Sequence, residues 1–228
     1  MVLARLHNGM MNTEPVEALL TDLSPKQRAD AQRNRDHLLT SAAATFIEEG
    51  PRVTMQRIAQ NAGVGIGTLY RHFPDRTALL SALSHRAYQA VLRLAQASRA
   101  AEVDPFLALR HFLVGTIAHR QSLVLPLHGA PVTASKIDLG LRLAISSELD
   151  QILQVGQRAG TLRQDVNATD IIVFGALLAQ GLPNLPEPTL AMERAAHVFI
   201  DGLRVTTSSL PGQLISRAEL EDRFKTNQ

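Results

Sequence analysis

Cysteine and tryptophan are absent from the 228 residues of this chain, and aromatic residues make up only 4% of it. Without cysteine the chain can form neither a disulfide bond nor a thiolate-ligated zinc site. Its hydrophobic content of 45% is ordinary, so the core has to be built from leucine, alanine, valine and isoleucine. This set of residues suits helices better than sheets.

Long apolar runs are missing as well. The longest candidate, Ile171 to Ala179, is far shorter than the about 18 residues that a membrane-spanning helix needs. The opening MVLARLHNGMMNTEP lacks the apolar core and the small-residue cleavage site of a signal peptide. We therefore expect a cytoplasmic protein with no membrane partner.

Patterns typical of enzymes are also lacking. The chain has eight histidines, but His111 and His119 are too far apart on one helix to share an ion, and no H-E-x-x-H motif occurs. No serine lies in a nucleophile elbow. The glycines of GVGIG fall between two short helices instead of after a strand, so a dinucleotide fingerprint is unsupported. We expect no catalytic residues, no metal site and no cofactor.

Positive charge, in contrast, is concentrated in one segment. The whole chain carries a formal net charge of +2, but residues 24–86 hold nine Lys or Arg against five Asp or Glu, a local net charge of +4. Residues 1–23 carry −2, and residues 87–228 are neutral. This distribution is typical of a nucleic-acid-binding module joined to a neutral domain, although a solvated basic face would give the same charge pattern.

The basic segment also has the spacing of a helix-turn-helix. Apolar residues recur at helical intervals over residues 30–49, where a glycine and a proline follow. Thr54 can cap a second helix that continues to Ala62, and Gly63 ends it. Residues 68–72 form a third short helix. Two short helices joined by a turn that begins with glycine are the signature of this motif.

The remaining residues predict further helices. A long helix starts at the N-cap Asp75 and reaches about residue 101, and Asp104 with Pro105 opens the next, over residues 105–119. Others are expected over residues 135–159, where Gly160 stops the helix, then from a cap at Thr169 or Asp170, and over 189–208. The helix containing IIVFGALLA is apolar almost all round, which suggests a subunit interface as well as a core. The sequence therefore predicts an all-α fold.

The segment GVGIGTLYRHFPDRTALL resembles the tetracycline-repressor (TetR) family of transcriptional regulators. RNRDHLLTSAAATFIEEG is similar to the first helix of that family, VTMQRIAQNAGV to the second, and AGTLRQDVNATDI, more weakly, to a loop of its C-terminal domain. The resemblance implies an N-terminal three-helix DNA-binding domain and a C-terminal helical bundle for effector binding and dimerisation. The expected organisation is a flexible arm (1–23), the helix-turn-helix domain (24–74), the helical domain (75–210) and a polar tail (211–228).

The DNA contacts follow from the way in which a recognition helix enters the major groove by its N-terminal end. The expected base contacts are Gln56, Gly65, Ile66, Thr68 and Arg71. The glycines at 65 and 67 have no side chain, so we expect Gln56 and Arg71 to make the main side-chain contacts to base edges. The positions that match phosphate contacts of the family are Thr54, Tyr70, His72 and Arg76, and Arg33 lies in a basic lead-in to the domain. Packing of Tyr70 on the core and a non-contacting Arg71 are the alternatives.

The C-terminal domain is expected to respond to a small molecule whose identity the sequence does not reveal. Candidate lining residues of the effector pocket, each of which could equally be core, are Phe106, Phe112, His119, Leu123, Leu127, Leu149 and Phe174. The resemblance implies a homodimer formed by the last two long helices, with Ile172, Leu178, Met192, Ala196, Phe199 and Leu203 as interface candidates. The predicted function is a ligand-responsive repressor of a palindromic operator. The alternative is a helical protein-interaction or lipid-carrier module without specific DNA binding.

Overall fold

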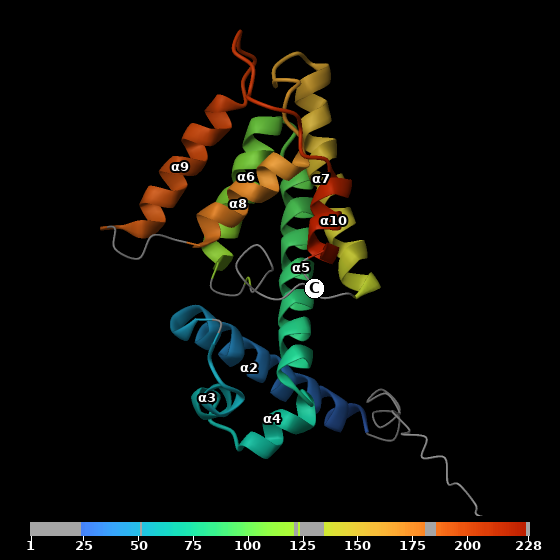
Figure 1. The fold of residues 1–228 in the computed structure, drawn as a ribbon, viewed down its shortest axis with the longest axis vertical. Helices are drawn as coiled ribbons and strands as arrows, with labels where there is room; N and C mark the ends of the chain where they lie inside the picture. The colour runs from blue at the N-terminus through green and yellow to red at the C-terminus, as the bar shows by residue number, and fades with distance from the viewer. Residues whose placement is uncertain (1–23, 51, 121–122, 124–134, 181–185, 227–228) are drawn as a thin grey trace, which may run out of the picture. The chain divides into compact units, whose positions relative to one another are not determined.

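A computed structural model describes residues 24–50, 52–120, 123, 135–180 and 186–226 of the chain (Figure 1). Within these ranges the ordered elements are helices, and the β-type pairing is a single isolated bridge between Leu162 and Arg204. The all-α prediction is therefore confirmed. The chain divides into two units, Met1–His37 and Leu38–Gln228. The helices are α2 (Pro25–Glu49), α3 (Met55–Asn61), α4 (Ile66–His72), α5 (Arg76–Ala101), α6 (Pro105–His119), α7 (Lys136–Arg158), α8 (Ala168–Gln180), α9 (Pro188–Gly202) and α10 (Arg217–Thr226).

The capping residues that the sequence indicates do begin helices. Thr54 caps α3, and its hydroxyl oxygen accepts a hydrogen bond from the backbone N–H of Arg57. Asp75 caps α5 in the same manner through Ala78, and Asp104 caps α6 with Pro105 in the first turn. Because each cap satisfies backbone N–H groups that a helix start leaves without partners, these boundaries are encoded locally.

One apolar cluster holds the second half of α2, α3, α4 and the start of α5 together. Its most deeply buried members include Ile58 and Leu69, which are both fully shielded from solvent, and Phe73. Gly63, in the turn between α3 and α4, has φ +67°, a left-handed conformation that glycine adopts without strain. The predicted helix-turn-helix is thus formed by residues that are close in sequence.

A second cluster forms the core of the C-terminal helices. It joins α5, α6, α7, α8 and α9, with Leu109, Leu113 and Leu149 completely buried. The helices approach closely where side chains are small, since a Cβ atom on Gly115 would lie 2.5 Å from a methyl group of Leu94. This packing is built from contacts between residues that are distant in sequence. None of the described helices has the length and apolar character required to cross a membrane.

The structure corrects several predicted boundaries. Helix α2 begins at residue 25 instead of 30, and α9 ends at Gly202 instead of near residue 208. The cap of α8 is neither Thr169 nor Asp170 but Asn167, whose side-chain oxygen accepts hydrogen bonds from the backbone N–H groups of both. Asp170 reciprocates by accepting a bond from the Asn167 N–H at 2.9 Å.

The tail contains the largest departure from expectation, because residues 217–226 form helix α10. We call residues 204–226 the C-terminal strap. Its helix binds α7 through Arg142 and Glu221, which form a two-pronged ion pair with distances of 2.9 and 2.7 Å. These side chains are only 12% and 10% exposed. The predicted polar tail (211–228) therefore contains a helix, because charged residues can order a helix when each finds a partner on the surface beneath.

Candidate nucleic-acid interface and C-terminal pocket

Helices α3 and α4 form the helix-turn-helix with one buried face each. In α4, Leu69 points into the core while Ile66 and Tyr70 remain 40% and 46% exposed. The N-cap of α4 is Gly65, which provides no side-chain hydrogen bond to the helix start. The N-terminal end of α4 therefore has no side-chain cap and exposes Ile66, and a recognition helix enters a DNA groove by this end.

The predicted base contacts lie mainly on this exposed surface. Gln56, Gly65, Ile66 and Arg71 are exposed, and Thr68 is half-buried. A Cβ atom added at Gly65 or Gly67 would meet nothing within 4 Å, so packing inside the chain does not explain why these two positions are glycine. Close approach of an external surface to the backbone would explain it.

Arg71 is held on α4 by weak local bonds. Its Nη2 donates to the hydroxyl of Thr68 at 3.2 Å, and its Nε donates to the carbonyl of Gly67 at 3.4 Å. Long hydrogen bonds from an exposed side chain to a neutral acceptor contribute little net stability. The Arg71 guanidinium can therefore give up these two hydrogen bonds and donate to a base edge instead. A base contact by Arg71 remains a prediction.

The predicted phosphate contacts have different surroundings. Thr54 is exposed, and because its oxygen accepts the Arg57 N–H, its own O–H remains a donor. Tyr70 is too exposed to be a core residue, and His72 is half-buried beside the ring of Phe73. Arg33, in the first unit, is exposed and paired with Asp30.

Arg76 has an internal role that the sequence did not indicate. Its Nη1 donates to the backbone carbonyl of Val53, and its guanidinium lies 4.9 Å from the ring centre of Phe46. These contacts join the start of α5 to the end of α2 and to the residue before the α3 cap. Arg76 thus supports the helix-turn-helix, and a phosphate contact through its other nitrogens remains a prediction.

A polar network that sequence reasoning missed joins α2 to α3. Glu49 accepts hydrogen bonds from Arg57 Nε at 2.8 Å and from Asn61 Nδ2 at 3.1 Å, and Asn61 also donates to Thr45. The amide of Asn61 and the guanidinium of Arg57 lower the pKa of the Glu49 carboxyl below its usual range. The partners are 8 and 12 residues from Glu49 and form no local motif, so only their meeting in the fold reveals them.

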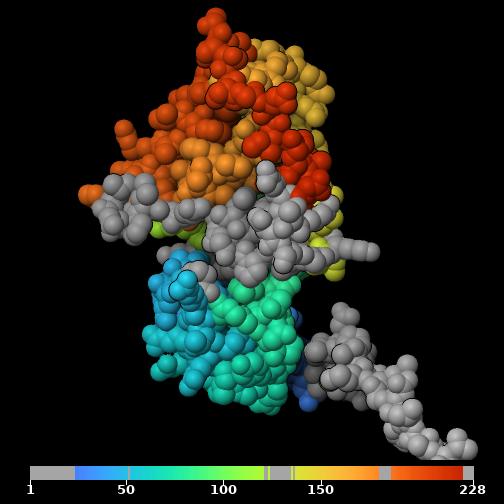
Figure 2. Space-filling view, in the orientation of Figure 1, coloured from blue at the N-terminus to red at the C-terminus, as the bar shows by residue number. Residues whose placement is uncertain are grey.

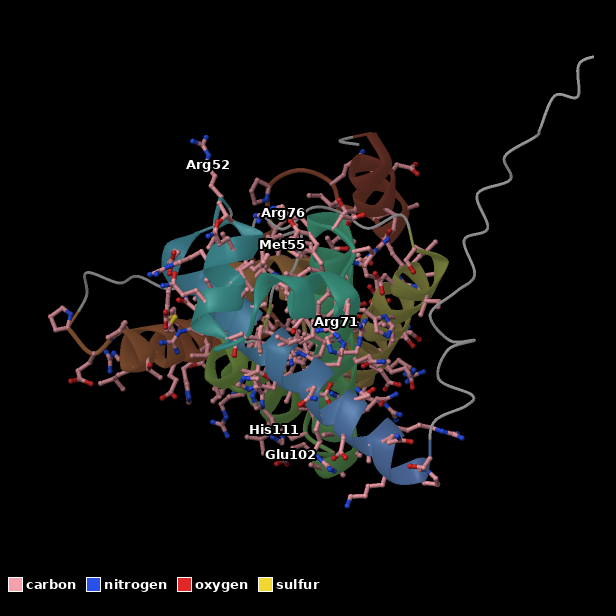
Figure 3. The ribbon with its side chains drawn as sticks, turned by 90° about the horizontal axis from the view of Figure 1, so that it is seen from below. Arg52, Met55, Arg71, Arg76, Glu102 and His111 are labelled. Carbon is pink, nitrogen blue, oxygen red and sulfur yellow. The ribbon has the colours of Figure 1, made fainter. Side chains whose placement is uncertain are left out.

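A further exposed cationic residue, Arg52, lies in the turn between α2 and α3. Figure 3 shows its side chain reaching away from the ribbon, whereas Arg76 and Met55 lie against it. Arg52 immediately precedes the segment that carries Val53 and the cap Thr54. Arg52 is exposed, and no motif singled it out in the sequence.

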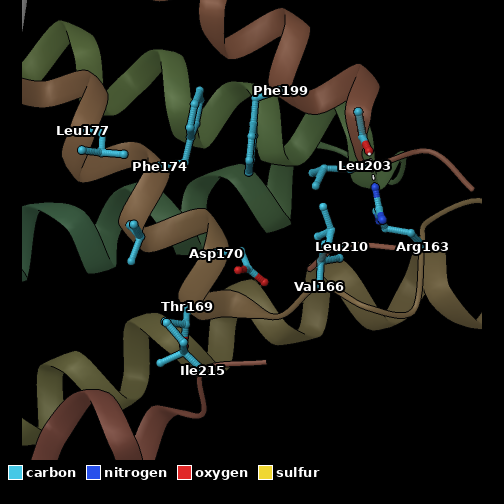
Figure 4. Close-up of a pocket in the computed structure, with 12 residues that line it drawn as sticks. Arg163, Val166, Thr169, Asp170, Phe174, Leu177, Phe199, Leu203, Leu210 and Ile215 are labelled. Atoms are coloured by element: carbon cyan, nitrogen blue, oxygen red, sulfur yellow. Dashed lines mark hydrogen bonds between the residues drawn. The ribbon is translucent and has the colours of Figure 1, made fainter. Parts of the chain in front are cut away.

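The C-terminal domain contains a pocket of about 480 Å³ between α8, α9 and the C-terminal strap (Figure 4). Two of its walls meet at Phe174 and Phe199, whose rings stack at a centroid distance of 3.9 Å and an angle of 8°. The lining is mostly apolar. It consists of Arg163, Val166, Thr169, Asp170, Val173, Phe174, Leu177, Phe199, Gly202, Leu203, Leu210 and Ile215.

Of the predicted effector-pocket residues that the structure describes, Phe174 lines this pocket and the others lie elsewhere. Phe106, Phe112, Leu123 and Leu149 are buried in the core, and His119 is exposed. Leu127 lies outside the described residues. The structure therefore brings together a different set of residues around this pocket, drawn from the loop between α7 and α8, from α8 and α9, and from the strap.

The predicted dimer-interface residues divide into buried and accessible ones. Leu178, Met192, Ala196 and Leu203 are buried within the chain itself, whereas Ile172 and Phe199 are half-buried. Buried side chains in the chain's own core offer no surface to a second subunit. The large apolar residues of α8 and α9 that do remain exposed are Val173, Leu177, Leu190 and Val198.

Two family models match the chain over most of the described helices. Residues 38–83 match "Bacterial regulatory proteins, tetR family", and residues 104–205 match "Transcriptional regulator SbtR-like, C-terminal domain". The first segment covers the end of α2, α3, α4 and the start of α5. The second covers α6 to α9. Both halves of the chain are therefore similar to regulators of transcription.

Individual relatives agree with these matches. An HTH-type transcriptional regulator of Staphylococcus aureus is 47% identical over 53 residues, which are 23% of this chain. The match spans only 29% of the length of that curated relative, less than a third of it. A TetR regulatory protein of Mycobacterium vanbaalenii is 35% identical, with a TM-score of 0.55, over 78% of this chain and 99% of that one.

A TetR transcriptional regulator of Streptomyces coelicolor is 32% identical, with a TM-score of 0.50, over 76% of this chain and 99% of that one. A TetR-family regulatory protein of Rhodococcus, at 17% identity and a TM-score of 0.62, shares the fold. Relatives above 30% identity that align over almost their whole length share this chain's helix-turn-helix and helical domain. The chain belongs to the TetR family of transcriptional regulators: it binds DNA through its helix-turn-helix and is not an enzyme.

Proposed function

We propose that the chain is a homodimeric repressor of a palindromic operator and that a small-molecule effector alters its DNA binding. The observation that carries the proposal is the exposed end of α4. There, two glycines unexplained by packing lie beside the exposed Ile66, Tyr70 and Arg71. In the cytoplasm, the chain would bind double-stranded DNA through this surface.

In this proposal α4 enters the major groove by its N-terminal end. Arg71 would contact a guanine and Gln56 a base from the neighbouring helix, while Ile66 could meet a thymine methyl group. Thr54 and Tyr70 would donate hydrogen bonds to phosphates. The exposed Arg52 would neutralise a phosphate charge. Phosphate contacts set affinity and its dependence on salt, whereas base contacts set sequence preference.

The exposed apolar residues of α8 and α9 support a homodimer. Val173, Leu177, Leu190 and Val198 are 36% to 74% exposed. Burying such residues against the same residues of a second copy stabilises a two-fold symmetric dimer. Two recognition helices related by that symmetry read half-sites about 34–36 Å apart, which gives the operator its palindromic sequence.

The effector would act by shifting the equilibrium between two conformations of the dimer. A ligand that binds better to one arrangement of the C-terminal helices favours that arrangement, and the recognition helices then cease to match successive major grooves. The alternative of a protein-interaction or lipid-carrier module has no support from the relatives, which are transcriptional regulators.

Fluorescence anisotropy with the DNA upstream of the chain's own gene tests the proposal. A shuffled fragment of equal length is the control, and both are titrated over a range of salt. We expect a preference of about 10³-fold or more for the native fragment. Equal, weak and steeply salt-dependent binding to both fragments would argue against an operator at that location. Sedimentation of the wild type beside a Leu177→Glu, Val198→Glu double variant tests the dimer, which the two carboxylates should dissociate.

A further inference from the structure

We infer that the C-terminal strap holds α5 against α7 through the Arg142–Glu221 ion pair, and that Glu221 is thereby a positioning residue for DNA binding. The inference deepens the proposed function, because it names an ion pair that would set the affinity for the operator. Helix α10 of the strap lies beyond residues 104–205, which match the C-terminal domain of the family. Figure 2 shows the red surface of the strap beside the yellow surface of α7.

Helix α5 is shared by the two apolar clusters of the protein. Leu79 and Leu83 pack in the cluster of the helix-turn-helix, whereas Ala87 and Tyr88 pack in the cluster of the C-terminal helices. The helix is continuous over its 26 residues. Because a continuous helix curves only gently, a shift in its middle also moves its first turns. A contact with residues 84–88 can therefore control the position of the helix-turn-helix.

Two polar contacts fasten α5 to α7 at this place. Nδ1 of His85 lies 2.8 Å from Oδ1 of Asp138, and the guanidinium of Arg142 lies 5.6 Å from the ring centre of Tyr88. His85 and Tyr88 are about one turn apart on α5, as Asp138 and Arg142 are on α7. Asp138 is 1% exposed and Tyr88 is 6% exposed. Polar groups buried so deeply are costly to separate from their partners, so these contacts fix the position of α5 against α7.

The strap completes the second of these contacts. The carboxylate of Glu221 accepts hydrogen bonds from Nε of Arg142 at 2.9 Å and from its Nη2 at 2.7 Å, on the guanidinium that lies over Tyr88. Arg217 of α10 pairs with Asp150 of α7 at 2.7 Å. The order of the two pairs is reversed, so α10 runs antiparallel to α7 (Figure 1). Removing one partner of a nearly buried ion pair is strongly destabilising, so Glu221 keeps the Arg142 guanidinium in place.

The start of the strap has anchors of its own. The backbone N–H of Leu210 donates to Asp165 at 2.8 Å, and Asn167 Nδ2 donates to the carbonyl of Ile215 at 2.9 Å. These bonds do not involve the side chain of Glu221. A substitution of Glu221 therefore tests the contact with Arg142 while the rest of the strap stays attached.

Three variants of the full-length protein isolate this contact. Glu221→Gln removes the carboxylate charge that Arg142 binds and keeps the size of the side chain. Glu219→Gln is the matched control on the same helix, because Glu219 accepts the backbone N–H of Ser216 at 2.6 Å, a capping role that glutamine also fills. Arg142→Met combined with Glu221→Leu is the rescue, since replacing both partners of a buried ion pair by apolar residues is often neutral or stabilising.

Amide hydrogen exchange and binding to the DNA upstream of the chain's own gene are measured at a temperature where every variant is folded. In Glu221→Gln we expect the amides of residues 85–91 to exchange at least about fivefold faster, while those of α9 stay protected. Binding to the native fragment should weaken by at least about fivefold. Sequence preference and salt slope should not change, because the DNA-binding surface keeps its charges. The control and the rescue variant should match the wild type in both measurements.

Two outcomes would overturn the inference. One is an unchanged affinity of Glu221→Gln for the native fragment. The other is faster exchange spread equally over α5 and α9, because that pattern is a general loss of stability. If the wild type itself does not prefer the native fragment over the shuffled one, the proposed function fails, and the comparison of α5 with α9 still decides whether the strap holds α5.

Discussion

The helix-turn-helix and the C-terminal helical domain are built in contrasting ways. Residues 54–78 carry their own caps, turn and buried leucine within a few residues of one another, and they expose polar and basic groups. The C-terminal domain is held by contacts between helices far apart in sequence, and its pocket collects residues from 163 to 215. A site made from neighbouring residues is visible in the sequence, whereas a site assembled by packing is not.

The largest losses of stability should come from replacing one completely buried leucine in each of the two regions with alanine. Leu69 and Leu149 are both completely buried. Replacing either with alanine leaves a cavity and should lower the free energy of unfolding by about 2–5 kcal/mol. Urea denaturation measures this loss. Leu69→Ala should also abolish operator binding, while Leu149→Ala at a temperature where it remains folded should keep it.

Ile66→Ala is the matched control for stability because Ile66 is 40% exposed. Its unfolding midpoint should stay close to that of the wild type, within about 0.5 kcal/mol. If Leu69→Ala left both stability and DNA binding unchanged, the helix-turn-helix core would not be the support that its burial indicates.

Within the DNA-binding surface, Arg71 and Arg76 should behave differently. Arg71→Ala should cost about 1–3 kcal/mol at one base pair of the operator and little at the others. Arg76→Ala should weaken binding to all sequences alike. If Arg76 holds a phosphate, the salt dependence of binding should also become less steep.

The internal contacts of Arg76 with Val53 and Phe46 give a second expectation, a lower melting temperature for Arg76→Ala. Binding to operator variants with single base changes, repeated at several salt concentrations, distinguishes the roles. If Arg71→Ala and Arg76→Ala bound all operator variants alike at every salt concentration, the assignment of Arg71 to a base contact and of Arg76 to support of the helix-turn-helix would be wrong. An unchanged salt slope with a lower melting temperature would assign Arg76 to the support alone.

The N-caps provide a smaller, matched test in the two regions. Asp75 accepts one backbone N–H at 2.7 Å, and Asp104 accepts two, at 2.7 and 3.3 Å. Each aspartate-to-alanine change should cost about 1 kcal/mol, with Asp104→Ala the larger. Replacement by asparagine, which also caps helices, is the control and should restore most of the stability in thermal unfolding. An equal loss in the asparagine variants would mean that charge, not capping, matters at these positions.

The smallest effect on stability is confined to alkaline pH and concerns the buried Tyr88. Burial raises the pKa of Tyr88 to about 12, although the neighbouring Arg142 opposes part of the shift. Because the folded state favours the neutral phenol, this stabilisation is complete below the ordinary value of about 10 and is lost as the pH rises towards 12. Tyr88→Phe should remove that part of the alkaline loss of stability.

The direct readout is the ultraviolet absorbance of tyrosinate in a Tyr70→Phe variant, which leaves Tyr88 as the sole tyrosine. Its absorbance should rise near pH 12 while the chain remains folded. A rise near pH 10 in the folded protein would contradict the burial of Tyr88 on α5 beside Arg142.

By itself, the sequence determined the helical class, the caps at Thr54, Asp75 and Asp104, the turn at Gly63 and the exposed residues of α4. Each of these depends on groups within about four residues, such as a side-chain oxygen that meets a backbone N–H one turn ahead. Asn167 was missed as the cap of α8 because Thr169 and Asp170 are equally good capping residues and the pattern could not choose among them.

Only the tertiary structure decided which apolar residues are core and which are accessible. Met192, Ala196 and Leu203 share a helical stripe with the half-buried Phe199, but their burial depends on helices packed against α9. The same holds for α10, whose polar sequence is ordered by ion pairs to Arg142 and Asp150. Packing and ion pairing between distant segments depend on where the backbone brings them, and no local rule contains that information.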